Sequence, residues 1–316
     1  MAHKLGRILL LLPFVLALSV AAQTLPGSTY IRLVPDAQGN PDALETSITR
    51  LTSPTGQKVD LVAAVHLGEE SYYRALNELF RDYDAVLYEA VLQEPSAGPA
   101  VQPSSGGGPA RAELPDNGAP GAAGPPQPEP AVQIDTENPG THPVTLAQRW
   151  LSRLLGLRYQ LGEIDYSAPN FVHADLTSTE LGAAMQDRGE TPIGLLLQLL
   201  TTSVEADPDA DRELSGVSLF RVVTGSVTPE ERVLLRRAFA RSFPKMDSVL
   251  AELQGSALLE ARNQRAVQVL RRQLEGGKSR IAVFFGTAHM PDLESRLVTE
   301  LGLTRQGQSW LTAWDL

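Results

Sequence analysis

The chain has 316 residues and a formal net charge of -10, because 37 acidic side chains outnumber 27 basic ones. A chain this acidic is not expected to wrap nucleic acid or anionic lipid, whose binding depends on clustered Lys and Arg. It contains no cysteine, which excludes disulfide bonds, thiolate metal sites and a lipid anchor on cysteine. Any metal must therefore be held by His, Asp and Glu side chains.

The first 22 residues have the pattern of a cleavable secretion signal. Lys4 and Arg7 precede an apolar run over residues 8–18, and small residues follow as far as Ala22. An uncleaved membrane anchor is the alternative, but a spanning helix needs about 20 apolar residues and this run is shorter. We therefore expect cleavage near Ala22 and a periplasmic or secreted protein with no stable membrane anchor.

Four elements are predicted before the middle of the chain. Residues 47–51 and 59–65 form two apolar strands around a turn at 54–56, which is typical of a hairpin. An amphipathic helix is expected over residues 69–82, and another strand is expected over residues 85–91, beside the strand at 59–65.

Residues 93–143 differ in composition from the rest of the chain. Twelve of the 23 prolines lie there, together with many Gly and Ala residues. Such a segment cannot bury enough apolar surface to offset its ordering entropy, so we expect a long disordered loop. Roughly 240 residues remain outside the signal and this loop, which suits one domain over residues 23–316, interrupted at 93–143.

Helical and strand-like patterns alternate again after the loop. Two Thr-x-x-Glu capping boxes, at Thr177 and Thr228, predict helix starts. Further helices are expected over 146–157, 257–275 and 293–301, and strand-like segments over 170–176, 281–287 and 303–314. Apolar strands that alternate with helices indicate an α/β fold, with a central mixed β-sheet flanked by helices.

Three polar residues follow or end the apolar strands. His66 and His289 each lie just before a predicted helix, and Glu89 lies near the end of the strand at 85–91. Sites form at the carboxyl ends of strands in such sheets, and two imidazoles with a carboxylate are a common set for a divalent metal. The alternative for each histidine is a structural hydrogen bond, and the alternatives for Glu89 are to face solvent at the sheet edge or to pair with Arg74 or Arg81.

The remaining polar motifs are interpreted as structural. His142 lies in the Pro/Gly-rich segment and is expected to be solvated, and His173 is expected to bond to the neighbouring Asp175 rather than a metal. Residues 207–211 alternate Asp with other residues as calcium loops do, but the Gly and Glu that such loops require are missing. We therefore expect a solvated loop there.

Four short segments resemble the TraB/PrgY/GumN family, which includes the TIKI proteases. Ala63 to His66 (AAVH) and Gly286 to His289 (GTAH) resemble the two GxxH motifs of that family. The strand that carries Glu89 (DAVLYEA) and residues 258–263 (LLEARN) are similar to its glutamate strand and its ERN-type helix start. The resemblance implies a fold like that of the erythromycin esterases and the ChaN haem-binding proteins.

The same resemblance implies roles for four residues. His66, Glu89 and His289 would hold a divalent metal such as Mn, Co or Zn, with Glu89 as a ligand or general base, and Arg262 would orient Glu89 or a substrate carbonyl. The expected activity is metal-dependent hydrolysis of a peptide or protein substrate.

Two departures from the family pattern leave other functions open. Ala63 stands where the family has Gly, and Ala261 stands where it usually has Glu. These changes are compatible with a non-catalytic protein that binds haem, metal or a peptide. A third alternative is metal-free ester hydrolysis with a histidine as the base.

Overall fold

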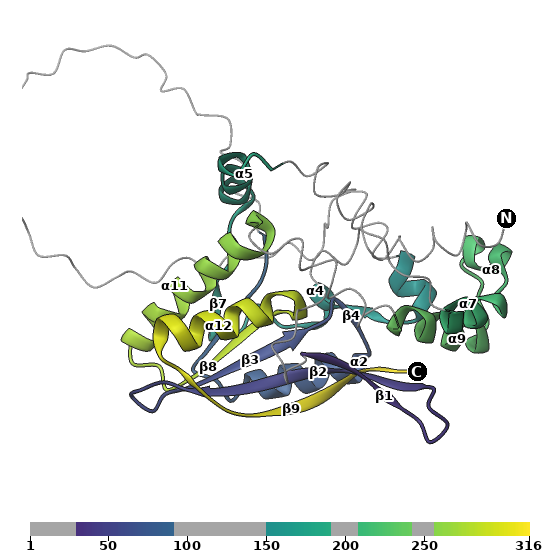
Figure 1. Ribbon diagram of the computed structural model, residues 1–316, viewed down its shortest axis with the longest axis horizontal. Helices are drawn as coiled ribbons and strands as arrows, with labels where there is room; N and C mark the ends of the chain where they lie inside the picture. The colour runs from purple at the N-terminus through teal and green to yellow at the C-terminus, as the bar shows by residue number, and fades with distance from the viewer. Residues whose placement is uncertain (1–29, 92–149, 191–207, 242–255) are drawn as a thin grey trace, which may run out of the picture.

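The computed structural model describes residues 30–91, 150–190, 208–241 and 256–316, and the statements below concern these ranges. The predicted signal, the Pro/Gly-rich segment at 93–143 and His142 lie outside them. The described part is an α/β fold in which helices flank a mixed β-sheet (Figure 1). Within it, no helix has both the length and the apolar composition needed to cross a bilayer.

The main sheet combines an antiparallel half with a parallel half. Its strands run in the order β1 (Ile31–Pro35), β2 (Pro41–Thr52), β3 (Lys58–Ala64), β8 (Arg280–Gly286), β5 (Ala85–Tyr88) and β7 (Phe171–His173), and β9 (Thr304–Asp315) also pairs with β2. The pairs that involve β2 are antiparallel, whereas β3, β8, β5 and β7 are parallel neighbours. A separate two-stranded sheet joins β4 (Leu67–Gly68) to β6 (Arg158–Tyr159).

The position of β8 corrects one expectation from the sequence. We expected the Glu89 strand to lie beside the strand that precedes His66, but β8 lies between them and pairs with both. Because β8 is buried on both faces and comes from the C-terminal part of the chain, only long-range packing decides this order.

Helices cover the two faces of the parallel half. On one face, α2 (Glu70–Phe80) buries Tyr72, Tyr73, Leu76 and Phe80 against the side chains of alternate strand residues such as Val62. On the other, α11 (Arg262–Glu275) and α12 (Met290–Leu301) pack with Leu61 and Ala63. Successive strand residues therefore enter different cores, which explains why β3 and β8 are apolar almost throughout.

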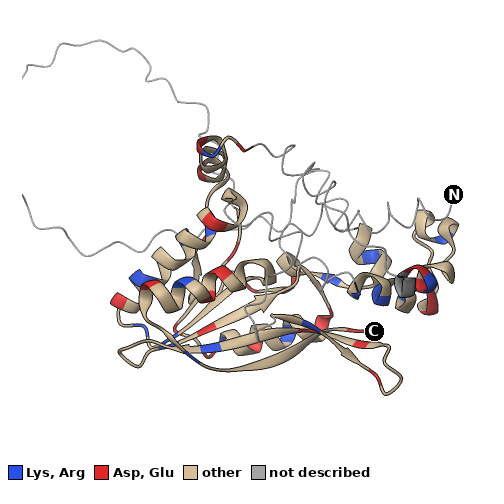
Figure 2. Ribbon diagram, viewed as in Figure 1, with Lys and Arg blue, Asp and Glu red and all other residues tan. Residues whose placement is uncertain are grey.

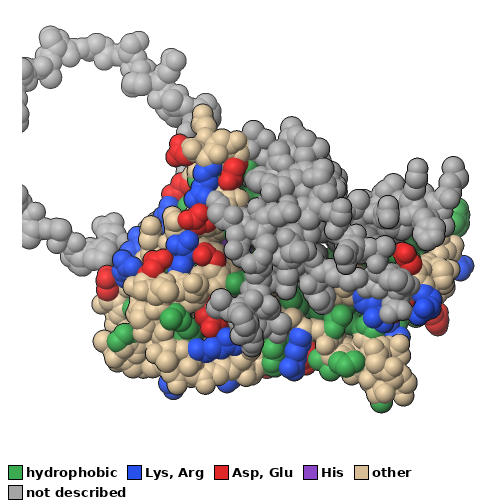
Figure 3. All heavy atoms as spheres, in the orientation of Figure 1, with side chains coloured by type: hydrophobic (Ala, Val, Ile, Leu, Met, Phe, Trp, Pro, Cys, Tyr) green, Lys and Arg blue, Asp and Glu red, His purple; other side chains and the backbone are tan. Residues whose placement is uncertain are grey.

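The outer surfaces of α11 and α12 are polar. Figures 2 and 3 show charged side chains of both signs interspersed along these helices. Arg296 lies between Asp292 at 2.7 Å and Glu300 at 3.1 Å, both one helical turn away. Such pairs are typical of a solvated helix face and contribute little individually.

The remaining helices are α4 (Gln160–Glu163), α5 (Ser178–Asp187), α7 (Pro208–Ser215), α8 (Leu219–Thr224) and α9 (Pro229–Ala240). Both predicted capping boxes are present: Thr177 and Thr228 each accept a backbone N–H, and the glutamate three residues on returns the bond. In Figure 1, α7, α8 and α9 gather at one end of the molecule.

Several boundaries differ from the sequence prediction. The expected solvated loop at 207–211 is wrong from residue 208 onward, because Pro208 begins a helix, a position that proline favours. The helix expected from residue 257 starts as a π-helix, η2 (Ala257–Ala261), before α11. The C-terminal tail is a single strand of 12 residues that pairs along β2.

Candidate functional site

The structure places His66, Glu89 and His289 at the same edge of the sheet. His66 follows β3, Glu89 directly follows β5, and His289 ends a single 3-10 turn, η3 (Thr287–His289), that directly follows β8. These strands are parallel, so their carboxyl ends meet. The backbone N–H of Glu89 also donates to the carbonyl of Phe284 at 3.2 Å, which fixes the glutamate beside β8.

His289 is completely buried and has a defined tautomer. Its Nδ1 lies 2.6 Å from Oδ1 of Asn263, and Nδ2 of Asn263 donates to Oδ2 of Asp292 at 2.8 Å. A carboxylate only accepts, so the amide nitrogen must face Asp292 and the amide oxygen must face the imidazole. Nδ1 of His289 therefore carries a proton, which leaves Nε2 as the ring nitrogen that is open to a second proton or to another ligand.

This second ring nitrogen faces Glu89. Nε2 of His289 lies 3.5 Å from Oε1 of Glu89. Among the described residues, Nε2 has no partner in hydrogen-bond geometry, although it is buried. A buried nitrogen without a partner is costly unless a proton or an ion joins it to the carboxylate.

Glu89 is a buried carboxylate that accepts hydrogen bonds from two other residues. Its Oε1 accepts from Nη2 of Arg262 at 2.7 Å, and its Oε2 accepts from the backbone N–H of Gly286 at 2.6 Å. Burial by itself would raise the pKa of Glu89, but the nearby His289 and Arg262 hold it well below the ordinary value. The carboxylate is thus ionised and points between His289 and Arg262, and it does not pair with Arg74 or Arg81.

Arg262 is held from the opposite side by Asp175. Two parallel bonds join them, from Nε to Oδ1 at 2.8 Å and from Nη2 to Oδ2 at 2.6 Å. Burial opposes the charge of Arg262, but the carboxylates of Asp175 and Glu89 raise its pKa. This corrects the expected bond between His173 and Asp175: His173 Nε2 lies instead 2.7 Å from the carbonyl oxygen of Ala90. A guanidinium is the stronger partner for a buried carboxylate.

His66 approaches the cluster from the side of α4. Its Nδ1 lies 3.1 Å from Oε1 of Gln160, whose backbone N–H donates to the carbonyl of His66 at 2.9 Å. Nε2 of Gln160 donates to the hydroxyl of Tyr166 at 2.9 Å, which orients the amide. Burial lowers the pKa of His66, with partial compensation from the charge of Glu89, so the ring is neutral near pH 7.

The charges of the cluster do not balance. Glu89 and Asp175 are two buried carboxylates, and Arg262 is one buried cation. Buried charges are stable only when compensated, so the cluster favours one more positive group. A proton on an imidazole or a bound metal ion would supply it.

The pair His289 and Glu89 fits a metal ion. Two ligand atoms, each about 2.1 Å from a tetrahedrally coordinated ion, lie roughly 3.4 Å apart. The observed separation of 3.5 Å between His289 Nε2 and Glu89 Oε1 agrees with this distance. Asn263 hydrogen-bonds to the other ring nitrogen of His289, as residues behind a metal-binding histidine commonly do. Among the described residues, no three His, Asp or Glu side chains already surround one point, so His66 would have to turn toward the pair.

Sequence reasoning missed the two residues that organise the site. Asp175 was assigned to His173, and Asn263 was only part of the helix-start motif. The adjacency of Arg262 and Asn263 at the start of α11 was the available signal, because both side chains then reach the ends of β5 and β8. Comparison with family models, with curated proteins and with solved structures finds no match to this chain.

Proposed function

We propose that this protein is an exported, divalent-metal-dependent hydrolase of the TraB/PrgY/GumN type, with an erythromycin-esterase-like fold and peptide bonds as its substrate. The observation that carries the proposal is the buried Nε2 of His289, which faces the ionised Glu89 without a hydrogen-bond partner among the described residues. The motifs at Ala63 to His66 and Gly286 to His289 support the same reading.

In this proposal, His289 and Glu89 hold the ion and His66 completes the set. When bound, a divalent ion such as Mn, Co or Zn supplies Lewis acidity, which polarises a carbonyl group and lowers the pKa of water. The protein contributes geometry and charge. Arg262 fixes Glu89, Asn263 fixes the tautomer of His289, and His66 is neutral and can bind the ion or accept a proton.

The decisive experiment is the metal content of the purified mature protein. We expect about one equivalent of a transition metal in the wild type, and loss of that metal in His66→Ala and in His289→Ala. His173→Ala is the matched control, because His173 contacts the Ala90 carbonyl and not the cluster. Absence of metal after incubation with manganese, cobalt and zinc would reject the proposal.

Metal-free ester hydrolysis is a second candidate that one observation favours. Both oxygens of Glu89 already accept hydrogen bonds, from Arg262 and Gly286, so the cluster is ordered without an ion. The neutral ring of His66 would then act as the general base on water. This candidate requires ester hydrolysis that survives chelation and is lost in His66→Gln, whereas the metal-dependent proposal requires loss on chelation.

The departures at Ala63 and Ala261 leave a binding role as the third candidate. Ala63 is fully buried in the core that β3 shares with α11 and α12, and Ala261 directly precedes Arg262. Haem titration of the mature protein tests one form of this role. A Soret band that disappears in His66→Ala, together with no hydrolysis of a broad peptide library, would favour a haem carrier over the hydrolase.

A further inference from the structure

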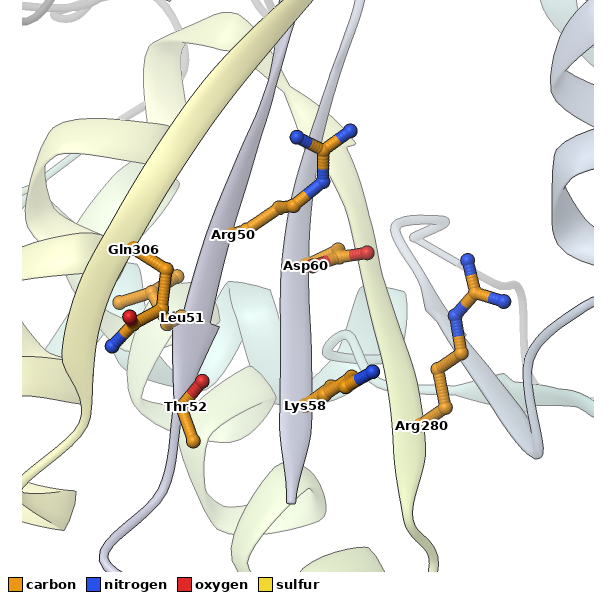
Figure 4. A pocket seen from close by; sticks show the side chains of 7 residues that line it. All are labelled: Arg50, Leu51, Thr52, Lys58, Asp60, Arg280 and Gln306. Atoms are coloured by element: carbon orange, nitrogen blue, oxygen red, sulfur yellow. The ribbon is translucent and has the colours of Figure 1, made fainter. Parts of the chain in front are cut away.

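A hollow lined mainly by polar and charged residues lies at the end of the parallel strands opposite to His66, Glu89 and His289. Its volume is about 370 Å³, and it is lined by Arg50, Leu51, Thr52, Lys58, Asp60, Arg280 and Gln306 (Figure 4). Lys58 and Arg280 are the first residues of β3 and β8, whereas the candidate hydrolytic site follows the last residues. With seven residues in each strand, the two places are about 20 Å apart.

The strand register gathers the charged side chains of the hollow. Arg50 pairs with Asp60 across β2 and β3, and Lys58 pairs with Arg280 across β3 and β8. Figure 4 shows Lys58 and Asp60 leaving β3 on the side of β8. The residues that line the hollow therefore include three cations and one carboxylate on adjacent strands. Asp82 pairs with one of these cations, Arg280, so one positive charge remains in excess in a chain whose net charge is -10.

Within the described part of the chain, Asp60 forms no ion pair with these cations. Asp60 is buried, and its Oδ2 accepts the hydroxyl of Tyr83 at 2.6 Å. The guanidinium of Arg280 lies over the ring of Tyr83, 4.6 Å from its centroid, and 3.5 Å from the exposed Asp82. The hydroxyl of Tyr83 thus hydrogen-bonds to Asp60, and the ring of Tyr83 positions Arg280.

The other two cations lack a carboxylate partner within the described part of the chain. Arg50 donates to the hydroxyl of Ser309 at 3.1 Å and forms no ion pair there, and Lys58 forms neither a side-chain hydrogen bond nor an ion pair there. Acidic residues outnumber basic ones in this protein, so cations left without carboxylates around a hollow are unexpected for a merely solvated surface. A dianionic ligand would neutralise them.

We propose that this hollow binds a small molecule through a phosphoryl group. A phosphate monoester carries a charge of about -1.5 to -2 near pH 7 and three strong acceptor oxygens. That charge is opposite in sign to the excess of the hollow, and an Arg fork with a Lys point charge is a common combination for phosphate. The volume lies in the range of about 300–1,000 Å³ that small-molecule sites occupy, so an organic group attached to the phosphate has room beside Thr52 and Gln306.

The test is calorimetric titration of the mature protein with inorganic phosphate at low ionic strength. EDTA is present, so that phosphate bound to a metal at the hydrolytic site does not contribute. We expect affinity to fall about tenfold or more in Lys58→Gln and in Arg50→Gln, because each removes one charge-assisted contact. Arg271→Gln is the matched control, since Arg271 is an exposed residue of α11 on the other face of the sheet.

A conservative variant and a vesicle experiment show whether the binding is specific for a phosphoryl group. Lys58→Arg keeps the charge and should retain most of the affinity, and equal thermal unfolding midpoints show that the variants are folded. Vesicles of phosphatidylcholine with and without phosphatidic acid distinguish a lipid headgroup from a soluble phosphate, and binding of either source supports the phosphoryl site. The proposal would be overturned if neither phosphate nor phosphatidic acid vesicles bind, or if Lys58→Gln and Arg271→Gln bind phosphate with equal affinity. Tighter binding of succinate than of phosphate would also overturn it. None of these outcomes depends on whether the protein is a hydrolase.

Discussion

The side-chain oxygen of Asn263 lies 2.6 Å from Nδ1 of His289 and decides which imidazole nitrogen faces Glu89. Asp292 fixes the orientation of the Asn263 amide from the other side. A neutral amide and a surface carboxylate therefore determine the tautomer of a fully buried histidine. The chemistry available at the edge of the sheet depends on this relationship.

The first prediction concerns Asn263 as a positioning residue. Asn263→Ala frees the imidazole to adopt the other tautomer, and we expect the affinity for zinc or manganese to fall about 10–100-fold. Competition with a chromophoric chelator measures this affinity directly. Gln264→Ala is the control, because the neighbouring Gln264 is exposed and its side chain donates to Glu260 rather than to His289. Equal affinities in the two variants would show that Asn263 does not act on the metal site.

The second prediction concerns the buried ion pairs of Arg262. Arg262→Met leaves Glu89 and Asp175 buried without their cation, so we expect the free energy of unfolding to fall by about 3–5 kcal/mol. Urea denaturation measures the change. Arg271→Met, an exposed substitution on the same helix, should change stability by less than about 0.5 kcal/mol. Arg262→Lys should recover only part of the loss, because lysine cannot make both bonds to Asp175 while it contacts Glu89.

The third prediction is a pH dependence due to Glu89. Its pKa in the folded protein lies well below the value of about 4.3 expected in the unfolded chain. The unfolded chain therefore takes up the proton first, so the stabilisation is complete above about pH 5 and declines as the pH falls toward the folded pKa. The difference in unfolding free energy between the wild type and Glu89→Gln should shrink over that window, with EDTA present.

Glu275→Gln is the control for this measurement. Glu275 is exposed at the end of α11 and forms no side-chain hydrogen bond or ion pair within the described part of the chain, so Glu275→Gln shows the effect of removing a carboxylate that has no such partner. The depressed pKa of Glu89 would be contradicted if the difference in unfolding free energy between the wild type and Glu89→Gln stays constant, or grows, as the pH falls.

The fourth prediction concerns the capping box at Thr228. Its hydroxyl accepts from the backbone N–H of Glu231, so Thr228→Ala should destabilise the protein by about 1 kcal/mol. Thr299→Ala should instead be neutral or slightly stabilising, because Thr299 is exposed in the interior of α12 and alanine is the better helix former. Thermal unfolding of the two variants compares a cap with a helix interior. Equal destabilisation by both substitutions would contradict the capping role.

Local patterns in the sequence were sufficient to predict most elements. The turn at residues 54–56 joins two paired strands, and Thr177 and Thr228 begin helices, because turn and cap geometry depend on residues only a few positions apart. The sequence also placed His66, Glu89 and His289 at strand ends, since apolar runs define where strands stop.

Only the tertiary structure decided how these elements meet. The insertion of β8 between β3 and β5 brings His289, rather than His66, against Glu89. The pairing of Asp175 with Arg262 likewise joins β7 to α11, which are remote in the chain. Strand order and buried ion pairs depend on which surfaces exclude water together, and that is a property of the whole packed chain and not of any short segment.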